Sequence, residues 1–498
     1  MRPLYFPSTK TTALLFLLAL GVGSLCSAAG QAGGVPGGGI GSGAPSAGGH
    51  ASAASAASGA SGSGQTGVAV GQRGAVTGAP QGQSAASVAY AAAASPGYDP
   101  RRPIKSKAGA NTLQQIIELT RTKNPTLLAA QENFHAVRAQ ELQAAVRANP
   151  YFGVTATVLT LPVDGSEGNP PFAAFQLSRL FERGHKRQFR MEAANATTAQ
   201  SQAQLEDAAR QTVLAVKQAF TRMLMSKASL ELSQTNLADF RHQVEIANVR
   251  YRAGDLGKLD FERLDLQLGS FESDAANAQI AFAQASSQIQ TLIGIEKPSV
   301  DFDIVGDVVP PVLAQTKDKL TQAALQSRPD LAAARAGVTA AQANARLAVA
   351  NGTSDPTLEV EFEKSGYYNT GGGSINFPLR IFDRNQGNKE AARFLADGSR
   401  FTETAARNQV ISDVDQAWVG YTQAKALSDR FGDHYLDESE DVLSIARFSF
   451  EHGGIALTDY LNALQQARSV TSDALNAYAQ TWNIIHQLSA ASATEVVP

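Results

Sequence analysis

The sequence predicts a mainly α-helical protein with a transmembrane β-barrel portion, built from two internal repeats. Three observations lead to this fold class. Two long segments without proline, residues 183–253 and 384–452, carry apolar residues at heptad spacing. Four β-prone segments of membrane-spanning length interrupt the helical sequence. Several landmarks recur in the same order after roughly 200 residues, which is typical of an internal duplication.

The N-terminal residues have the features of a secretory signal. Arg2 and Lys10 precede a short apolar core at residues 13–20, and small residues follow up to Ala29. The core is shorter than the roughly 20 residues that a helix needs to cross a bilayer. We therefore expect residues 1–28 to be a signal peptide and the chain to be exported.

The single cysteine, Cys26, lies near the end of this signal. Cleavage after Ala28 would remove it, whereas a lipoprotein signal would make it the acylated N-terminus. Leu25 stands before it, where a lipoprotein signal has a small residue. Removal is therefore the favoured interpretation, and lipidation is the alternative. In both cases the sequence predicts no disulfide framework and no cysteine-based metal site.

Residues 29–102 are expected to form a disordered tether, because residues 29–97 are almost entirely Gly, Ala, Ser, Val and Gln. Such a composition cannot bury enough apolar surface to offset the entropy lost on ordering. Folded sequence is therefore expected to begin near Pro103. The formal net charge of -3 argues against a nucleic-acid partner.

The folded part divides into two repeats, residues 103–316 and 317–490, followed by a short tail at residues 491–498. Each repeat opens with a short helix that ends at a proline, Pro125 in the first and Pro329 in the second. An Ala- and Gln-rich run follows each proline, and β-prone segments come next. Because these landmarks recur in one order, we interpret the chain as duplicated.

Two long helices are expected in each repeat, one before and one after a glycine-containing break. At 1.5 Å per residue, the longer helix of each repeat would be on the order of 100 Å long. Its heptad-spaced apolar residues predict packing against other helices in a left-handed supercoil. The expected helices span about residues 183–253 and 259–293 in repeat 1, and about 384–452 and 458–489 in repeat 2.

The β-prone segments form two predicted hairpins. The first is closed by a loop rich in Pro, Gly and Asp at residues 162–171, and the second by a short turn at residues 369–372. Strands of about 9–11 residues match the length of a transmembrane β-strand. Weak alternation of apolar and polar residues is usual for outer-membrane strands. The expected strands are about residues 151–161 and 172–181, then 357–367 and 373–382.

Four strands cannot close a barrel by themselves. Open sheet edges in lipid leave backbone groups unsatisfied, at several kcal/mol each, so the chain is expected to oligomerise. Three copies would supply twelve strands and leave a pore, whereas two would supply eight and leave barely room for side chains. The alternative is a soluble pair of hairpins at the end of a helical bundle.

The breaks in the long helices follow one pattern. In each repeat a glycine stands three residues after an aromatic residue and six residues before an aspartate. These residues are Tyr251, Gly254 and Asp260 in repeat 1 and Phe450, Gly453 and Asp459 in repeat 2. An aromatic residue follows each aspartate, Phe261 in repeat 1 and Tyr460 in repeat 2. The strand hairpins also close alike, with Phe, an acidic residue and Arg. The residues of these strand-to-helix junctions are Phe181 and Arg183, then Phe382 and Arg384.

This combination of paired repeats, hairpin ends and helix breaks resembles the TolC family of outer-membrane efflux proteins, also called outer membrane factors. The resemblance extends from Leu113 to about Ser489. Residues 376–387, which read Asn-Phe-Pro-Leu-Arg-Ile-Phe-Asp-Arg-Asn-Gln-Gly, are most similar to the CzcC-like heavy-metal efflux branch of that family.

The resemblance implies a homotrimer, with a twelve-stranded β-barrel in outer-membrane lipid that continues as a long α-helical coiled-coil barrel into the periplasm of a Gram-negative-type cell. It implies a passive exit duct that works with a periplasmic adaptor (membrane fusion) protein and an inner-membrane pump of the resistance-nodulation-division class. Divalent heavy-metal cations are the cargo expected for this branch. The alternatives are a duct for drugs or secreted polypeptides and, from another class, a non-channel periplasmic coiled-coil structural protein.

The resemblance also assigns the helix breaks to the periplasmic tip, where the family docks its adaptor and closes its entrance. The gate residues would be Tyr251, Gly254, Lys258, Asp260, Phe450, Gly453 and Asp459. Three copies of each aspartate around a narrow opening would form a negative ring that favours cations. The same aspartates could instead cap the helices that follow. One departure from the family's best-studied closed gate is that residues 454–457 contain no basic residue.

Motifs for catalysis, cofactor binding or metal binding are not found in the sequence. It contains no Walker loop, dinucleotide fingerprint or Ser-His-Asp order. Residues 371–373 are all glycine, but a strand and not a helix is expected to follow, so we interpret them as part of a hairpin turn. The histidines of the folded part are scattered, without a pair at i,i+4. We therefore expect no enzymatic activity, no cofactor and no metal site.

Overall fold

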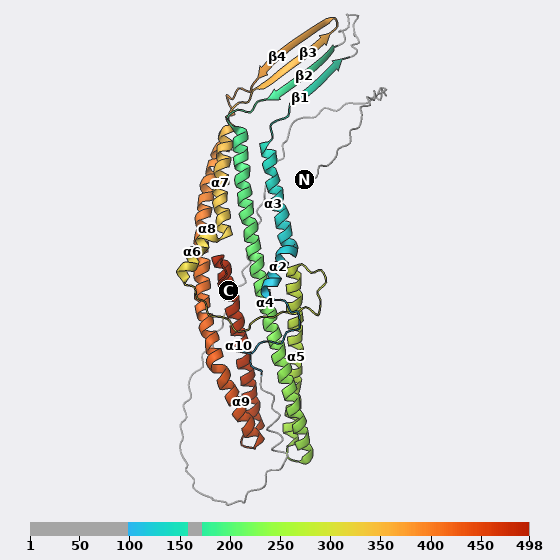
Figure 1. The fold of residues 1–498 in the computed structure, drawn as a ribbon, viewed down its shortest axis with the longest axis vertical. Coiled ribbons are helices and arrows are strands. Elements are labelled where there is room, and N and C mark those ends of the chain that lie inside the picture. Colours follow the sequence, from blue (N-terminus) through green and yellow to red (C-terminus); the bar gives the residue numbers. More distant parts are fainter. Residues whose placement is uncertain (1–97, 158–171, 498) are drawn as a thin grey trace, which may run out of the picture. The chain divides into compact units, whose positions relative to one another are not determined.

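The computed structural model describes residues 98–157 and 172–497 (Figure 1). These residues fall within the larger of two units of the chain, Gln83–Pro498. The predicted signal peptide with Cys26, most of the predicted tether and the predicted loop at residues 162–171 lie outside the described residues. Residues 98–102 of the predicted tether are described, and they pack against helices, so that prediction was wrong at its C-terminal end.

Each repeat begins with two short helices that a single residue separates. Pro125 and Pro329 each occupy the first position of the second helix, which confirms the predicted proline steps. Proline fits there because the first amides of a helix have no intrahelical acceptor. The four helices are α2 (Leu113–Lys123) and α3 (Pro125–Ala145), then α6 (Lys317–Ser327) and α7 (Pro329–Ala350).

The long helices of repeat 1 are α4 (Lys186–Ala253) and α5 (Lys258–Ile293). α4 has 68 residues and is therefore about 100 Å long at 1.5 Å per residue. It starts after His185, whose φ of 58° is left-handed and cannot continue a right-handed helix. A left-handed residue, Asn385 with φ 62°, also precedes the equivalent helix of repeat 2.

The prediction of one unbroken helix at residues 384–452 was wrong. The structure has α8 (Gln386–Arg430), a π-helical turn η1 (Phe431–Tyr435) and α9 (Leu436–Glu451). Gly432 lies in this π-turn, where an added Cβ would stand 3.0 Å from the hydroxyl of Tyr478. A π-turn inserts one residue into the helix and redirects it, which heptad spacing alone does not reveal. The last helix is α10 (Leu457–Ser492), which extends into the segment predicted as a tail.

The four strands form one antiparallel sheet in the order β1-β2-β3-β4. The predicted turn at residues 369–372 was wrong, because those residues lie inside β4 and the hairpin turns at Gly366 and Tyr367. Ser365 pairs with Tyr368, and Gly366 takes the positive φ of 58° that such a tight turn requires. The strands are β1 (Tyr151–Thr157), β2 (Phe172–Leu180), β3 (Thr357–Ser365) and β4 (Tyr368–Asn376).

The sheet and the adjoining helices share one lateral order. α3 packs on α4, α4 on α7 and α7 on α8, while the strands that continue from these helices pair as β1-β2-β3-β4 (Figure 1). α3 and β1 therefore lie at one edge, and α8 and β4 at the other. α3 buries none of its residues within the single chain.

Three clusters of buried side chains hold the helices together. The first joins α2, α4, α5 and α10 around residues such as Ile116, Met223 and Ile289. The second joins α6, α7, α8 and α10. The third, which we call the tip core, joins α4, α5 and α10 around Phe240 and Phe271. In the described part of the chain, no helix is both long enough and apolar enough to span a bilayer.

Candidate functional site

Two turns connect the long helices at the end opposite the sheet (Figure 1). We call them the tip turns: residues 254–257 between α4 and α5, and residues 452–456 between α9 and α10. Gly254 has a φ of 87° and Gly453 a φ of 73°. A Cβ added to either would meet no atom within 4 Å, so the left-handed backbone, and not lack of space, calls for glycine.

An aromatic stack spans each tip turn. The rings of Tyr251 and Phe261 lie 5.1 Å apart with an interplanar angle of 4°. The rings of Phe450 and Tyr460 lie 5.2 Å apart with an angle of 8°. Each stack fixes the helix that leaves the turn against the helix that enters it. Each stack joins two residues of one repeat, and the two stacks use equivalent positions of the two repeats.

Asp260 and Asp459 each stand third in the helix after a tip turn. The N-cap positions belong to Gly257 and Ala456, and neither helix has a side-chain cap hydrogen bond. The aspartates are therefore not N-caps, although a carboxylate in the first turn is still favoured by the helix dipole. Their predicted role in a charged ring stays a prediction.

The charged neighbours of these aspartates lie on the surface. Asp260 is 3.7 Å from Arg263, one turn further along α5. Lys258, the basic residue predicted near the gate, lies 3.4 Å from Glu262 and not beside an aspartate. Both ion pairs are exposed, and such pairs contribute little to stability. Among the described residues, neither aspartate forms an ion pair with a residue of the other repeat.

The tip core ties the hairpins of the two repeats together. Phe240 and Phe271 stack at 4.3 Å, which joins α4 to α5. The Arg468 guanidinium of α10 lies 4.0 Å from the centre of the Phe271 ring and pairs with Asp274 of α5. This contact combines a cation–π interaction with a charge pair. Motion of one hairpin relative to the other therefore has to disrupt it.

A group of polar side chains also connects the two hairpins, and sequence reasoning missed its charged members, Asp239 and Arg447. Tyr460 of α10 is 2% exposed, and burial raises its pKa although Arg447 of α9 acts in the opposite direction. Burial likewise raises the pKa of the Asp239 carboxyl of α4, partly offset by the charge of Arg447. The Arg447 Nε is buried without a hydrogen-bond partner. No sequence motif marks Asp239 or Arg447, because their proximity to Tyr460 arises only from helix packing.

Both predicted strand-to-helix junctions precede a long helix, but only the first directly follows a strand, because β2 ends at Leu180 whereas β4 ends at Asn376 and not at residue 382 as predicted. The Phe181 amide donates to the Pro356 carbonyl at 2.9 Å, and the Arg183 amide donates to Asp355 Oδ1 at 2.8 Å. Asp355 also accepts from the buried Lys186 Nζ at 2.5 Å. One carboxylate from repeat 2 thus fixes the junction of repeat 1, a long-range contact that the sequence does not reveal.

The junction of repeat 2 is more open. Phe382 is 90% exposed. The Arg384 amide donates to the Gln386 side chain at 2.9 Å, and the Asn385 side chain donates to the Ala348 carbonyl at 2.8 Å. The two junctions therefore differ both in their side-chain contacts and in their distance from the preceding strand.

The two faces of the sheet differ in polarity. The register pairs Glu361 of β3 with Gln176 of β2 and with Gly372 of β4. Because side chains alternate along a strand, Glu359, Glu361 and Glu363 share one face. The other face holds large apolar side chains that are 42–65% exposed in the single chain: Phe152, Val154, Phe175, Leu177, Leu358, Val360, Phe362 and Ile375.

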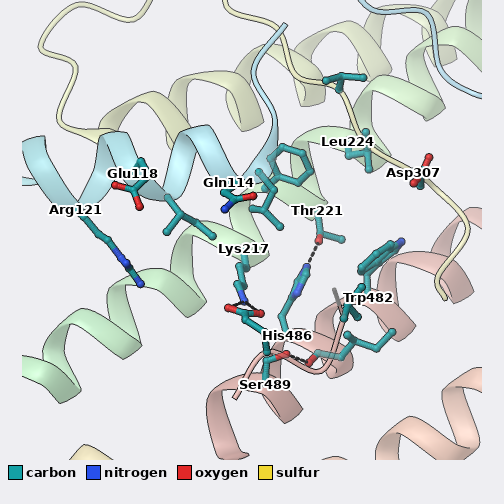
Figure 2. Close-up of a pocket in the computed structure, with 18 residues that line it drawn as sticks. Gln114, Glu118, Arg121, Lys217, Thr221, Leu224, Asp307, Trp482, His486 and Ser489 are labelled. Atoms are coloured by element: carbon teal, nitrogen blue, oxygen red, sulfur yellow. Dashed lines mark hydrogen bonds and ion pairs between the residues drawn. The ribbon is translucent and has the colours of Figure 1, made fainter. Parts of the chain in front are cut away.

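A cavity of about 520 Å³ lies between α2, α4 and α10 (Figure 2). Lys217 of α4 donates to both carboxylate oxygens of Glu495 at 2.6 Å. The ring of His486 lies 3.0 Å from the Thr221 hydroxyl. Burial, with a contribution from Lys217, lowers the pKa of His486 to about 3, so this histidine is neutral near pH 7. These contacts therefore join α4 to α10 and to the residues that follow it.

The described residues contain no cluster of His, Cys, Asp or Glu able to hold a metal ion. What the geometry offers is a set of half-buried to exposed carboxylates, on the sheet face and at the tip turns, that can attract cations without binding them tightly. Weak contacts at several places are what conduction requires.

Comparison with known families gives a match over most of the chain. The model of the outer membrane efflux protein family matches residues 116–295 and 320–494. A curated relative, the cobalt-zinc-cadmium resistance protein CzcC of Cupriavidus metallidurans, is 25% identical over 370 residues. That alignment covers 73% of this chain and 86% of the relative.

Solved structures show the same fold. A CusC structure is 18% identical with a TM-score of 0.66, and the match covers 80% of this chain and 99% of CusC. A membrane protein from Pseudomonas aeruginosa is 18% identical with a TM-score of 0.67, covering 79% of this chain and 95% of that protein. The fold is that of the TolC-like outer-membrane channels.

Proposed function

The chain belongs to the outer membrane efflux protein family, and on this premise we propose that it is the passive exit duct of a tripartite efflux system for divalent heavy-metal cations. As a member of this family it lies in the outer membrane and extends into the periplasm. The family consists of transport channels and not of enzymes.

The free edges of the fold support a homotrimeric duct. β1 and β4 are the unpaired edges of the sheet, and α3 and α8 are the edges of the helix layer. Unpaired strand edges are costly in lipid, and closure into a ring removes them. Pairing β4 with β1 of a second copy would also cover α3, which buries no residue in the single chain. Three copies would give twelve strands and a pore.

The carboxylates of β3 are the observation that carries the cargo proposal. In a membrane barrel the apolar face contacts lipid and the opposite face lines the pore. The exposed apolar side chains around Val360 and Phe362 identify the lipid face. Glu359, Glu361 and Glu363 would then line the lumen, repeated in each copy of the trimer. Rings of carboxylates raise the local concentration of cations and repel anions.

The curated relative supports the same cargo class, because its name describes resistance to cobalt, zinc and cadmium. A duct that releases divalent cations has to admit them at both ends. The carboxylates of Asp260 and Asp459 at the tip turns and those of β3 in the sheet would provide a negative potential at each end.

The partners we propose are a periplasmic adaptor protein and an inner-membrane pump of the resistance-nodulation-division class. The tip turns are the candidate docking surface, because their residues Gly254, Asp255 and Gly453 are exposed and have a small side chain or none. The duct itself would supply no energy, so the pump would drive export.

Conductance measurements on the purified protein test this proposal. We expect trimers in a planar lipid bilayer to form pores that prefer cations over anions. Replacing Glu359, Glu361 and Glu363 together by Gln should lower the cation-to-anion permeability ratio toward one, measured from the reversal potential in a salt gradient. Lys364→Gln is the matched control, because Lys364 lies on β3 with its side chain on the opposite face.

Two outcomes would contradict the proposal. A protein that inserts no pores would favour a non-channel structural role for the long helices. Pores whose selectivity is the same with and without the three glutamates would retain the duct but remove the assignment of a cation cargo, leaving drugs or polypeptides as the substrates to test.

A further inference from the structure

The π-turn η1 between α8 and α9 is the bend in the second repeat. Single π-helical turns interrupt the regular hydrogen-bond ladder of a helix, and they often occur where a helix has a functional bend. A side chain at position 432 would be crowded, because its Cβ would stand 3.0 Å from the Tyr478 hydroxyl. The direction of α9 relative to α8 therefore depends on contacts made at this turn.

The segment of residues 98–102, which we call the strap, makes these contacts. Arg101 Nη1 donates to the Gly432 carbonyl at 3.1 Å, inside the π-turn. Arg101 Nη2 pairs at 2.8 Å with Asp437, in the first turn of α9. A single guanidinium thus holds the backbone of the bend and the start of the helix beyond it, in the multidentate manner typical of arginine.

The strap itself is fixed. Asp99 Oδ1 accepts from the Arg101 amide at 2.9 Å and from Arg101 Nε at 3.0 Å. Burial opposes ionisation of Asp99, but the hydrogen bonds from Arg101 outweigh it and keep the pKa of this carboxyl below its ordinary value. Tyr98 packs on the first core cluster, which includes α4. The strap therefore connects the body of the fold to the bend in repeat 2.

α9 has room to move if this connection is broken. It packs mainly on α10 and on the π-turn. Its outward side chains Val442, Ile445 and Phe448 are exposed in the single chain. A cavity of about 90 Å³ lies between the strap, α4, α9 and α10. A small change of angle at η1 would be amplified along α9 to the tip turn.

We propose that Arg101 is a clamp that holds the bend at the π-turn, and that its release lets α9 change direction and shifts the duct toward a more open tip. This inference rests on the proposed function, because it needs a channel whose opening can change. The clamp lies well away from the tip residues and acts on them through the length of α9.

The test compares Arg101→Gln and Asp437→Asn with Arg102→Gln in full-length trimers in planar bilayers. Arg102 is the matched control, since it belongs to the same strap but, among the described residues, its side chain forms an ion pair with Asp99 alone, at 3.9 Å. We expect the fraction of time in the high-conductance state to rise roughly two- to fivefold in the first two variants, as loss of a partly exposed ion pair implies. Arg102→Gln should behave as the wild type.

Hydrogen exchange supplies a second measurement that does not need conduction. Amides of α9 should exchange faster in Arg101→Gln, whereas those of α5 should not change. Arg101→Lys keeps the charge but loses the forked geometry, so it should give an intermediate effect. It replaces Arg101→Gln in the test if the glutamine variant does not fold. Equal open fractions and equal α9 exchange in the Arg101 and Arg102 variants would overturn the clamp. A wild-type protein without pores would instead refute the proposed function, and α9 exchange would still test the clamp.

Discussion

Asp459 shows how a side chain at the tip can act on conduction without holding the fold together. It is exposed in the first turn of α10 and is not the N-cap. Asp459→Ala should change cation conductance while trimers persist, because three carboxylates would be lost from around the opening. Single-channel recording and gel filtration measure the two properties. Unchanged conductance and selectivity would leave Asp459 only its favourable position near the helix dipole.

His486 predicts a pH dependence of stability. Its folded pKa of about 3 lies below the ordinary 6.5 of histidine, so the unfolded chain takes up the proton first. The contribution of His486 to the free energy of unfolding is therefore fully present above pH 6.5. It is lost as the pH drops toward 3, by at most about 1.4 kcal/mol per pH unit. His486→Gln should flatten the fall in melting temperature between pH 7 and pH 5, measured by circular dichroism.

The exposed His452 of the second tip turn is the control for this experiment. His452→Gln should leave the slope of melting temperature against pH as it is in the wild type. If His486→Gln and the wild type lose stability equally over this range, the buried histidine does not govern the acid response.

Substitutions at two glycines allow the effect of backbone strain to be measured separately from the effect of packing. Neither Gly254 nor Gly269 has an atom within 4 Å of an added Cβ, but only Gly254 has a positive φ. Gly254→Ala should destabilise the α4–α5 hairpin by about 1 kcal/mol, whereas Gly269→Ala, inside α5, should stabilise it by a similar amount. Urea denaturation measures both changes, and equal effects of the two substitutions would exclude a role for the left-handed turn.

At the scale of single elements, sequence patterns placed the long helices and the glycine breaks well, because helix periodicity and left-handed glycines are local properties. They misplaced the second hairpin turn. Residues 371–373 looked like a turn by composition, yet Gly366 provides the positive φ and the glycine run continues β4. The π-turn at Phe431–Tyr435 was also missed, because a one-residue insertion in a helix leaves no mark in composition.

Contacts between distant elements were beyond the reach of sequence reasoning. Lys186 and Asp355 lie in different repeats, as do Asp239 and Arg447. Each of these residues looks like an ordinary surface charge when it is considered alone. Only the packing of α4 beside the second repeat explains why they lie together and are partly or fully withdrawn from solvent. The aromatic stacks at the tip turns were closer to prediction, because both partners had been identified by their spacing from the glycines.

α3 provides the prediction at the scale of the helix layer. Leu142 is 74% exposed in the single chain, near the end of the edge helix that a neighbouring copy would cover. Leu142→Glu should weaken trimer formation, because it would place a charge in an apolar contact. The neighbouring Gln143→Glu adds the same charge to an exposed polar position and serves as control. Light scattering of the purified proteins gives the oligomeric state, and intact trimers of Leu142→Glu would refute this seam.

The whole molecule combines two sets of carboxylates with a fold that has free edges on both sides. The long helices separate the sheet from the tip turns by about 100 Å, so the two sets would act at opposite ends of one conduit. Within such a conduit, charge selectivity and opening are separate properties. The strand glutamates would control the first, and the tip turns, through the bend at η1, would control the second.

Growth of a deletion strain tests the central claim most directly. The strain would be complemented with the wild-type gene or with the variant carrying Gln in place of Glu359, Glu361 and Glu363. Inhibition would then be measured across Zn²⁺, Co²⁺, Cd²⁺, Ni²⁺ and Cu²⁺ and a panel of dyes and antibiotics. We predict sensitivity to one or more of the metals, fully reversed by the wild type and only partly by the variant. Sensitivity confined to the organic compounds would contradict the account of a metal-cation duct.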